Sequence, residues 1–249
     1  MKKIASLIIL LATMFSLFAC TSNNSASQGP VLNNAELWKI ARYATIPQSE
    51  NNTQIKMTID LDMSYSGTKT STTAEVKAIV KNGQAYMYML SAGMKGEVWY
   101  KDDYLYYKTE YMGETDQYKK PGTLKELKEM IAEDANFDDF SFFPTEAEIE
   151  AAKVTRQGSR TIMTITFNPE NHTNEIGELA ELGTIQTATV AYTFDAENHV
   201  NKMKIVFKIV EEKQGLDAKI VVNVDLSRLD NPANIVFPSD LDTYKLYFN

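Results

Sequence analysis

The segment 55–65 alternates apolar and polar side chains without interruption. Its even-numbered positions are polar, and its odd-numbered positions carry Ile55, Met57, Ile59, Leu61, Met63 and Tyr65. Successive side chains of a β-strand point to opposite faces of the sheet, so this pattern predicts a long strand with one face on the core. Asn82-Gly83 predicts a two-residue hairpin turn, because both residues tolerate the positive φ of a type I′ turn. Together the two signals indicate an antiparallel sheet.

Further strands and a few helices account for the rest of the folded chain. Strands are expected near 74–80, 84–90, 97–100 and 104–107, and later near 161–167, 188–194, 203–209 and 216–226. Helices are expected at 34–44, where Asn34 can cap, after the capping boxes Thr123-x-x-Glu126 and Thr145-x-x-Glu148, and at 173–182. The pattern predicts an α+β fold, with a strongly curved antiparallel sheet covered by a few helices.

The N-terminus has the organisation of a secretory leader. Met1-Lys2-Lys3 precedes an apolar run over 4–18, which is shorter than the ~20 residues that a membrane-spanning helix needs. The sequence Leu17-Phe18-Ala19-Cys20 then resembles the lipobox of bacterial lipoproteins. This resemblance implies a cleaved signal peptide over residues 1–19 and attachment of lipid at Cys20, through acyl chains such as palmitate. An uncleaved transmembrane anchor is the alternative interpretation.

The segment that follows the cysteine is too polar to fold by itself. Residues 20–30 are small and polar, which predicts a flexible, lipidated tether. The remaining residues, 31–249, have the length of a single domain. A lipid on Cys20 would hold this domain at the cell membrane or the outer membrane, on its extracytoplasmic side.

Charge and cysteine content exclude several classes of function. The formal net charge of −8 makes nucleic acid an unsuitable partner, because phosphate binding needs a basic surface. Cys20 is the single cysteine of the chain, which excludes an intrachain disulfide and a cysteine-based metal site.

The sequence shows no catalytic motif. His172 and His199 are the two histidines, and each lies beside a predicted turn or helix start, where a solvated turn residue is expected. Neither an H-E-x-x-H pattern nor a G-x-S-x-G pattern occurs. The chain is therefore predicted not to be an enzyme, with no catalytic residue, no cofactor and no metal site.

The order of elements, together with three short strings, resembles the LolA, LolB and LppX superfamily of lipoprotein carriers, in its extracytoplasmic lipoprotein branch. The strings are Lys81-Asn82-Gly83-x-x-Tyr86-Met87, Val98-Trp99-Tyr100 and Asn234-Ile235-Val236-Phe237-Pro238. The resemblance implies a half-open barrel that wraps a hydrophobic cavity, closed by helices and filled by acyl chains or another apolar ligand.

A set of methionine and aromatic residues is the candidate wall of such a cavity. The set is Met57, Met63, Tyr86, Met87, Tyr88, Met89, Trp99, Met163 and Met203. Methionine is flexible and common at adaptable apolar surfaces, although each methionine can equally be ordinary core. The aromatic residues can line the mouth of a cavity or lie on the outer face of the sheet. Two hypotheses remain open: a protein that binds a lipid or another hydrophobic molecule, and a structural lipoprotein with a filled core that meets an unknown protein partner.

Overall fold

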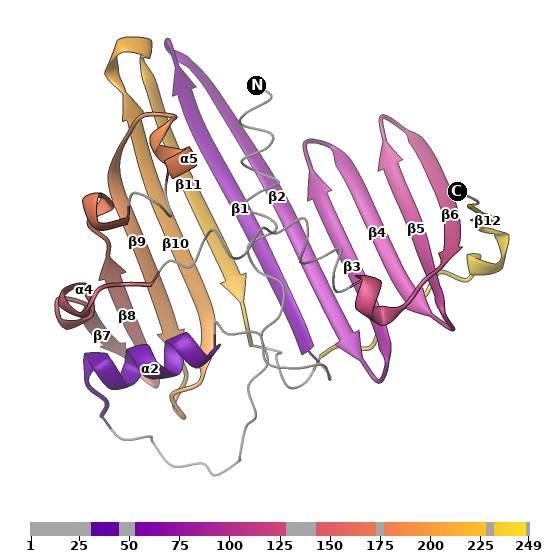
Figure 1. Ribbon diagram of the computed structural model, residues 1–249, viewed down its shortest axis with the longest axis horizontal. Coiled ribbons are helices and arrows are strands. Elements are labelled where there is room, and N and C mark those ends of the chain that lie inside the picture. The colour runs from indigo at the N-terminus through magenta and orange to yellow at the C-terminus, as the bar shows by residue number, and fades with distance from the viewer. Residues whose placement is uncertain (1–30, 45–52, 128–142, 173–176, 228–231, 248–249) are drawn as a thin grey trace.

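The computed structural model describes residues 31–44, 53–127, 143–172, 177–227 and 232–247 (Figure 1). The predicted signal peptide, the tether and the lipid attachment site Cys20 lie outside these residues. The expected helix at 173–182 is described only from residue 177 onward. Single helices and strands are named below as they are labelled in Figure 1.

Twelve strands form one sheet, in the spatial order β12-β6-β5-β4-β3-β2-β1-β11-β10-β9-β8-β7. The first meander consists of β1 (Thr53–Tyr65), β2 (Thr68–Lys81), β3 (Gln84–Ser91), β4 (Met94–Lys101), β5 (Tyr104–Tyr111) and β6 (Glu114–Pro121). The second consists of β7 (Lys153–Gln157), β8 (Arg160–Thr166), β9 (Thr184–Phe194), β10 (Val200–Glu211) and β11 (Leu216–Asp225). β1 and β11 join the two meanders, and β12 (Lys245–Leu246) lies parallel to β6.

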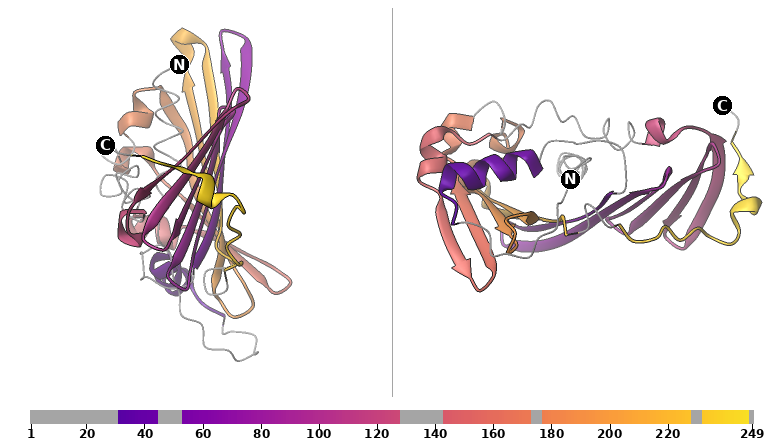
Figure 2. Two further views of the ribbon diagram at one scale, coloured as in Figure 1. Left: turned by 90° about the vertical axis from the view of Figure 1, so that its right-hand side faces the viewer. Right: turned by 90° about the horizontal axis from the view of Figure 1, so that it is seen from below.

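The sheet is curved and does not close, because β12 and β7 lie at opposite ends of it (Figure 2). The helices lie on its concave side, here called the concave face, and residues 232–247 run along the opposite side, the outer face. The expectation of a large curved antiparallel sheet with few helices is confirmed. The sheet dominates the structure, and its shape is consistent with a half-open barrel.

Tight turns connect the strands of the first meander. Asn82 and Gly83 have φ angles of 51° and 75°, which confirms the predicted type I′ geometry. Positive φ angles also occur at both central residues of the other turns, Ser66-Gly67, Ala92-Gly93, Asp102-Asp103 and Met112-Gly113. Turns of this type match the right-handed twist of the strands, so the meander keeps a fixed register from β1 to β6.

Helix α2 (Asn34–Ala44) lies across the ends of the second meander on the concave face (Figure 1). Its cap is one residue earlier than expected, because Asn33 Oδ1 accepts from the Glu36 N–H at 2.9 Å and the Glu36 carboxylate accepts from the Asn33 N–H at 2.8 Å. The Asn34 side chain instead donates to the carbonyls of Ile149 and Ala152, at 3.1 and 2.9 Å. Asn34 therefore joins α2 to the end of a second helix.

That second helix is α4 (Glu146–Glu150), which begins at the predicted capping box. Thr145 Oγ1 accepts from the Glu148 N–H, and the Glu148 carboxylate accepts from the Thr145 N–H. The box at Thr123 and Glu126 also forms, and residues 124–127 are helical. Helix α5 (Gly177–Ala180) packs near β9.

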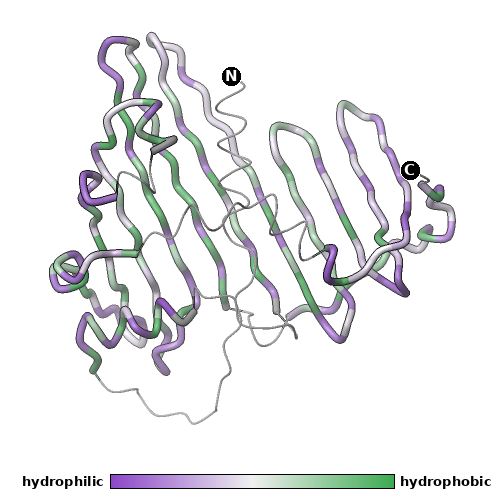
Figure 3. The backbone as a smooth tube through the Cα atoms, viewed as in Figure 1, coloured by the Kyte–Doolittle hydropathy of each residue, from purple (hydrophilic) through white to green (hydrophobic). Residues whose placement is uncertain are grey.

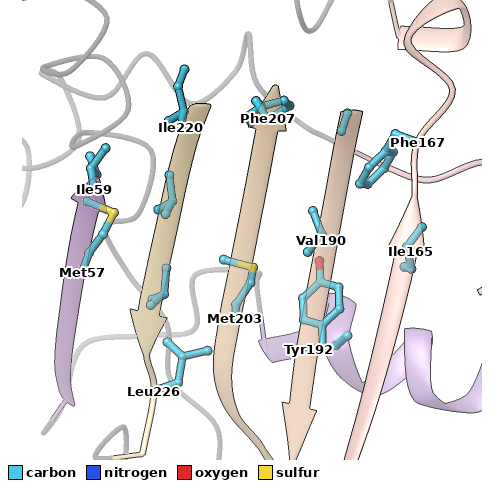
Figure 4. Packing of buried hydrophobic residues seen from close by; sticks show 14 of the residues in the cluster. Met57, Ile59, Ile165, Phe167, Val190, Tyr192, Met203, Phe207, Ile220 and Leu226 are labelled. Atoms are coloured by element: carbon cyan, nitrogen blue, oxygen red, sulfur yellow. The ribbon is translucent and has the colours of Figure 1, made fainter. Parts of the chain in front are cut away.

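Apolar side chains recur at every second position along the long central strands (Figure 3). On the concave face they form the main core cluster, part of which is seen in Figure 4. The cluster includes Leu37, Ala41, Met57, Ile59, Met163, Ile165, Phe167, Val190, Tyr192, Phe194, Met203, Phe207, Ile220 and Leu226. A smaller cluster on the same face, with Val80, Ala85, Val98, Leu105, Tyr107 and Leu127, covers the first meander.

Candidate functional site

Four of the predicted methionines lie in one row across the concave face. The strand register places Met163 opposite Tyr192, and Tyr192 opposite Met203. The row then continues through Val224 to Met57, through Val76 to Met89, and ends beside Gly96 on β4. Strands from both meanders therefore contribute to a single methionine-rich line.

Most of this row is filled core. Met163, Met57 and Met203 are only 0, 2 and 4% exposed. Helix α2 covers this end, and its Trp38 ring meets the Tyr192 ring edge-on, with centroids 6.0 Å apart. Burial raises the pKa of Tyr192 well above its usual value, as expected for a phenol removed from water. These three methionines are therefore part of the buried core.

The row opens where it crosses β2, β3 and β4. Val76 and Met89 are half-buried, and so is Met87, which lies opposite Ala78 and Val98 in the adjacent row. Among the residues that the structure describes, no atom lies within 4 Å of a Cβ atom added to Gly96, so these residues leave open space directly above Gly96. We refer to Val76, Ala78, Met87, Met89 and Gly96 as the concave patch.

The remaining candidates are separated from the concave patch. Met63 is half-buried near the far end of β1, where it lies opposite Thr70 and Ala218 and packs against the main core cluster. Tyr86, Tyr88 and Trp99 point to the outer face, because they alternate with the inward-facing residues of β3 and β4. The expected single wall is therefore divided between two faces, and only Met87 and Met89 face the open part.

Residues 232–247, here called the C-terminal strap, account for the burial of Trp99. The indole N–H donates to the Val236 carbonyl at 3.1 Å, and Trp99 packs in a cluster with Tyr106, Leu241 and Tyr244. Further along, the Tyr247 N–H donates to the Lys119 carbonyl at 2.8 Å, beside the β12–β6 pairing. On the outer face of the first meander, Trp99 and Tyr106 are thus covered by the chain itself.

A buried acid and histidine pair was not expected from the sequence. His172 is 2% exposed, so its interpretation as a solvated turn residue is wrong. Its Nε2 lies 3.0 Å from a carboxylate oxygen of Glu148, and its ring meets the Phe167 ring edge-on, with centroids 5.1 Å apart. The carboxylate also accepts from the backbone N–H groups of Thr145 and Asn168, at 2.8 Å each.

Hydrogen bonds decide the charge state of Glu148. Burial by itself would raise the pKa of this carboxyl group, but donation from Asn168, Thr145 and His172 outweighs it and lowers the pKa below its usual value. The carboxylate is therefore ionised and fully engaged. Both side chains are buried, and the pair ties α4 to the turn at Pro169–His172.

Two further observations concern the described part of the chain. Within it, no group of three or more His, Cys, Asp or Glu side chains is placed to hold a metal ion. None of the helices described has the length and apolar character that crossing a bilayer requires.

Comparisons with known proteins assign no family. No protein-family model matches the chain, and no curated protein does. One similar solved structure is a DUF1329 family protein from Desulfovibrio piger, with 7% identity over 81% of this chain and 92% of the other, at a TM-score of 0.24. The YwiB protein from Bacillus subtilis has 10% identity over 71% of this chain and 93% of the other, at a TM-score of 0.20. Transferrin-binding protein B from Neisseria meningitidis has 14% identity over 72% of this chain and 26% of the other, at a TM-score of 0.21.

Proposed function

We propose that this chain is a non-catalytic lipoprotein, anchored through Cys20 on the extracytoplasmic side of a membrane, that binds a lipid or another hydrophobic molecule at the concave patch. The observation that carries the proposal is the change in burial along the methionine row. The row is filled by the protein's own side chains from β8 to β1, yet it is only half-buried over β2 to β4, where the described residues leave open space above Gly96.

The residue types of the patch suit an apolar ligand. Methionine side chains adapt to ligands of different shape, and each buried CH₂ of an acyl chain contributes roughly 0.8 kcal/mol. Gly96 supports this use, because a glycine inside a strand leaves room for close approach to the backbone. In this proposal, the apolar row of the concave patch contacts one chain of a lipid.

The anchor is tested by replacing the lipidated residue. Cys20→Ser removes the thiol that would carry the lipid, so the protein should leave the membrane fraction, since two acyl chains are what hold such proteins at a bilayer. Fractionation of cells that express either form measures this. Equal membrane partitioning of Cys20→Ser and the unchanged protein would contradict lipid anchoring and favour an uncleaved transmembrane leader.

Ligand binding is tested by filling the space above Gly96. Gly96 has no positive φ, and the described residues leave open space at its Cβ, so Gly96→Phe needs no strained backbone and directs a ring onto the concave patch. If the ring displaces two methylenes of the ligand, binding weakens by about tenfold. The measurement is photolabelling of the membrane-bound protein with a diazirine analogue of a long-chain fatty acid, with the labelled residues mapped by mass spectrometry.

Gly96→Ala is the matched control, because it removes the glycine but adds only one carbon. Label should appear on Met87 and Met89 in the unchanged protein and in Gly96→Ala, and should fall by up to about tenfold in Gly96→Phe. Equal labelling of the two variants would contradict a ligand site on the concave patch. It would favour the other hypothesis, a lipoprotein with a filled core that meets a protein partner.

A further inference from the structure

Three segments that are distant in the sequence meet on the outer face. The Lys81 ammonium donates to the Pro232 carbonyl at 3.0 Å and to Asn234 Oδ1 at 2.9 Å. The Trp99 indole donates to the Val236 carbonyl, as described above. These bonds hold the first part of the C-terminal strap across β2, β3 and β4, on the side away from the helices (Figure 2).

A cavity of about 350 Å³ lies under this crossing. It is lined by side chains of β2, β3, β4 and β5 and by the strap residues Asn234, Val236, Phe237 and Pro238. We refer to it as the strap cavity. Its volume falls within the range of small-molecule sites, roughly 300–1,000 Å³.

The strand register gives the strap cavity two different walls. Ile79 lies opposite Tyr86, and Tyr86 lies opposite Trp99, so these three form an apolar and aromatic row. The adjacent row carries charged residues: Lys77 on β2, Glu97 on β4 and Lys108 on β5. A molecule in the cavity therefore meets apolar surface on one side and charge on the other.

Two of the three charged groups are already engaged. The Glu97 carboxylate accepts from the Tyr86 hydroxyl at 2.9 Å and pairs with Lys95 at 2.8 Å. Burial and this bond to Glu97 raise the pKa of Tyr86 well above its usual value, so the phenol remains a donor. The Lys108 ammonium pairs with Glu110 at 2.8 Å.

Lys77 differs from these groups. Among the residues that the structure describes, it contacts no carboxylate. The residue directly opposite it on β1 is a second cation, Lys56, which pairs with Glu75 at 3.0 Å. Within the described ranges, the strap cavity thus contains one cation without a counter-ion, at the edge of an aromatic wall.

We propose that the strap cavity binds a small amphipathic organic anion. Its anionic group, such as a carboxylate, receives charge-assisted hydrogen bonds from the Lys77 ammonium. Its apolar body lies between the row of Ile79 and Trp99 and the strap residue Phe237. This site is on the opposite face of the sheet from the concave patch, so it does not depend on the function proposed above.

Trp99 provides a direct reporter for this site. The chain has two tryptophans, Trp38 and Trp99, so Trp38→Phe leaves the indole of the strap cavity as the sole one and keeps a ring against Tyr192. Three probes of equal size and different charge are titrated into the full-length protein: 3-phenylpropionate, 3-phenylpropanol and 3-phenylpropylamine. We expect a saturable change in Trp99 emission with the carboxylate and none with the amine.

The positive charge of Lys77 is then removed by a substitution that keeps the size of the side chain nearly constant. Lys77→Met should weaken binding of 3-phenylpropionate by about tenfold, because a partly desolvated charge-assisted bond is removed while the apolar stem remains. Lys204→Met is the control, since Lys204 is exposed on the outer face of the distant strand β10 and should not alter binding. Gly96→Phe should also leave binding unchanged.

Three results would overturn the proposal. The first is the absence of a saturable change with 3-phenylpropionate. The second is an equal effect of Lys77→Met and Lys204→Met. The third is loss of binding in Gly96→Phe with normal binding in Lys77→Met, which would place the probe on the concave patch. Failure of this site and failure of the concave patch are therefore distinguished by different variants.

Discussion

Replacing Glu148 with alanine should lower the free energy of unfolding by about 3–5 kcal/mol, the usual cost of removing one member of a buried pair. The carboxylate accepts from Thr145, Asn168 and His172, and its removal leaves these buried donors without their acceptor. The same change also releases α4 from the turn at Pro169–His172. Urea denaturation of the two proteins measures the difference.

Glu150→Ala is the matched control for this prediction. Glu150 lies on the same short helix and is exposed, so its removal should change the free energy of unfolding by no more than about 0.5 kcal/mol. Similar effects of Glu148→Ala and Glu150→Ala would show that the buried pair does not stabilise the fold.

The pH dependence of stability identifies the carboxylate charge as the cause. The pKa of Glu148 in the folded chain lies below its ordinary value of 4.5. The stability that its charge provides is therefore complete above pH 4.5 and is lost as the pH falls through the lowered pKa of the folded state. Glu148→Gln keeps the shape of the side chain and removes its charge. The difference in unfolding free energy between the unchanged protein and Glu148→Gln should therefore be constant near neutral pH and shrink in acid. A difference that is the same at every pH would exclude this explanation.

The strands that build the core were predictable from the sequence, and the strands at the edges were not. The alternation over 55–65 corresponds to β1, because a strand with one buried face needs an apolar residue at every second position. β6 and β7 lie next to or at the ends of the sheet and are mostly exposed or half-buried. Their backbones pair with a neighbour without burying an apolar face, so their sequences carry no alternation.

The residues of the candidate ligand wall were chosen from the sequence by type, and their arrangement in the sheet was not considered. Tyr86 and Met87 are adjacent in a strand, so they point to opposite faces and cannot line one surface. The period of two could have separated them from the sequence alone. The meeting of Met57 and Met203 in one row could not be predicted, because it depends on the register between strands that are far apart in the chain.

The pair of Glu148 and His172 had no local signal. Glu148 was recognisable as the third residue of a capping box, and this part of its role is confirmed. His172 lies 24 residues further along the chain and is brought to it by packing against Phe167. From the sequence alone, a short polar segment before a predicted helix is expected to be solvated, even where the tertiary structure buries one of its side chains.

Truncating a methionine should lower the free energy of unfolding much more in the buried part of the methionine row than in its open part. Met203→Ala should lower the free energy of unfolding by about 2–5 kcal/mol, because Met203 is enclosed between Tyr192 and Val224 and its removal leaves a cavity. Met89→Ala should cost no more than about 1 kcal/mol, since Met89 is only half-buried and lies opposite Gly96, above which the described residues leave open space. Urea denaturation of the two variants measures this difference.

Photolabelling by the diazirine fatty acid should show the reverse order. Met89→Ala takes apolar surface away from the ligand and should reduce labelling of Met87 several-fold, because each methylene that is no longer buried weakens binding by roughly 0.8 kcal/mol. Met203→Ala should leave labelling of the concave patch unchanged, because Met203 lies in the filled part of the row under α2 and not in the open part. If Met89→Ala instead destabilises the chain as much as Met203→Ala and labelling stays the same, Met89 is packed core. The concave face would then be filled along its whole length, and its methionines would serve the sheet alone.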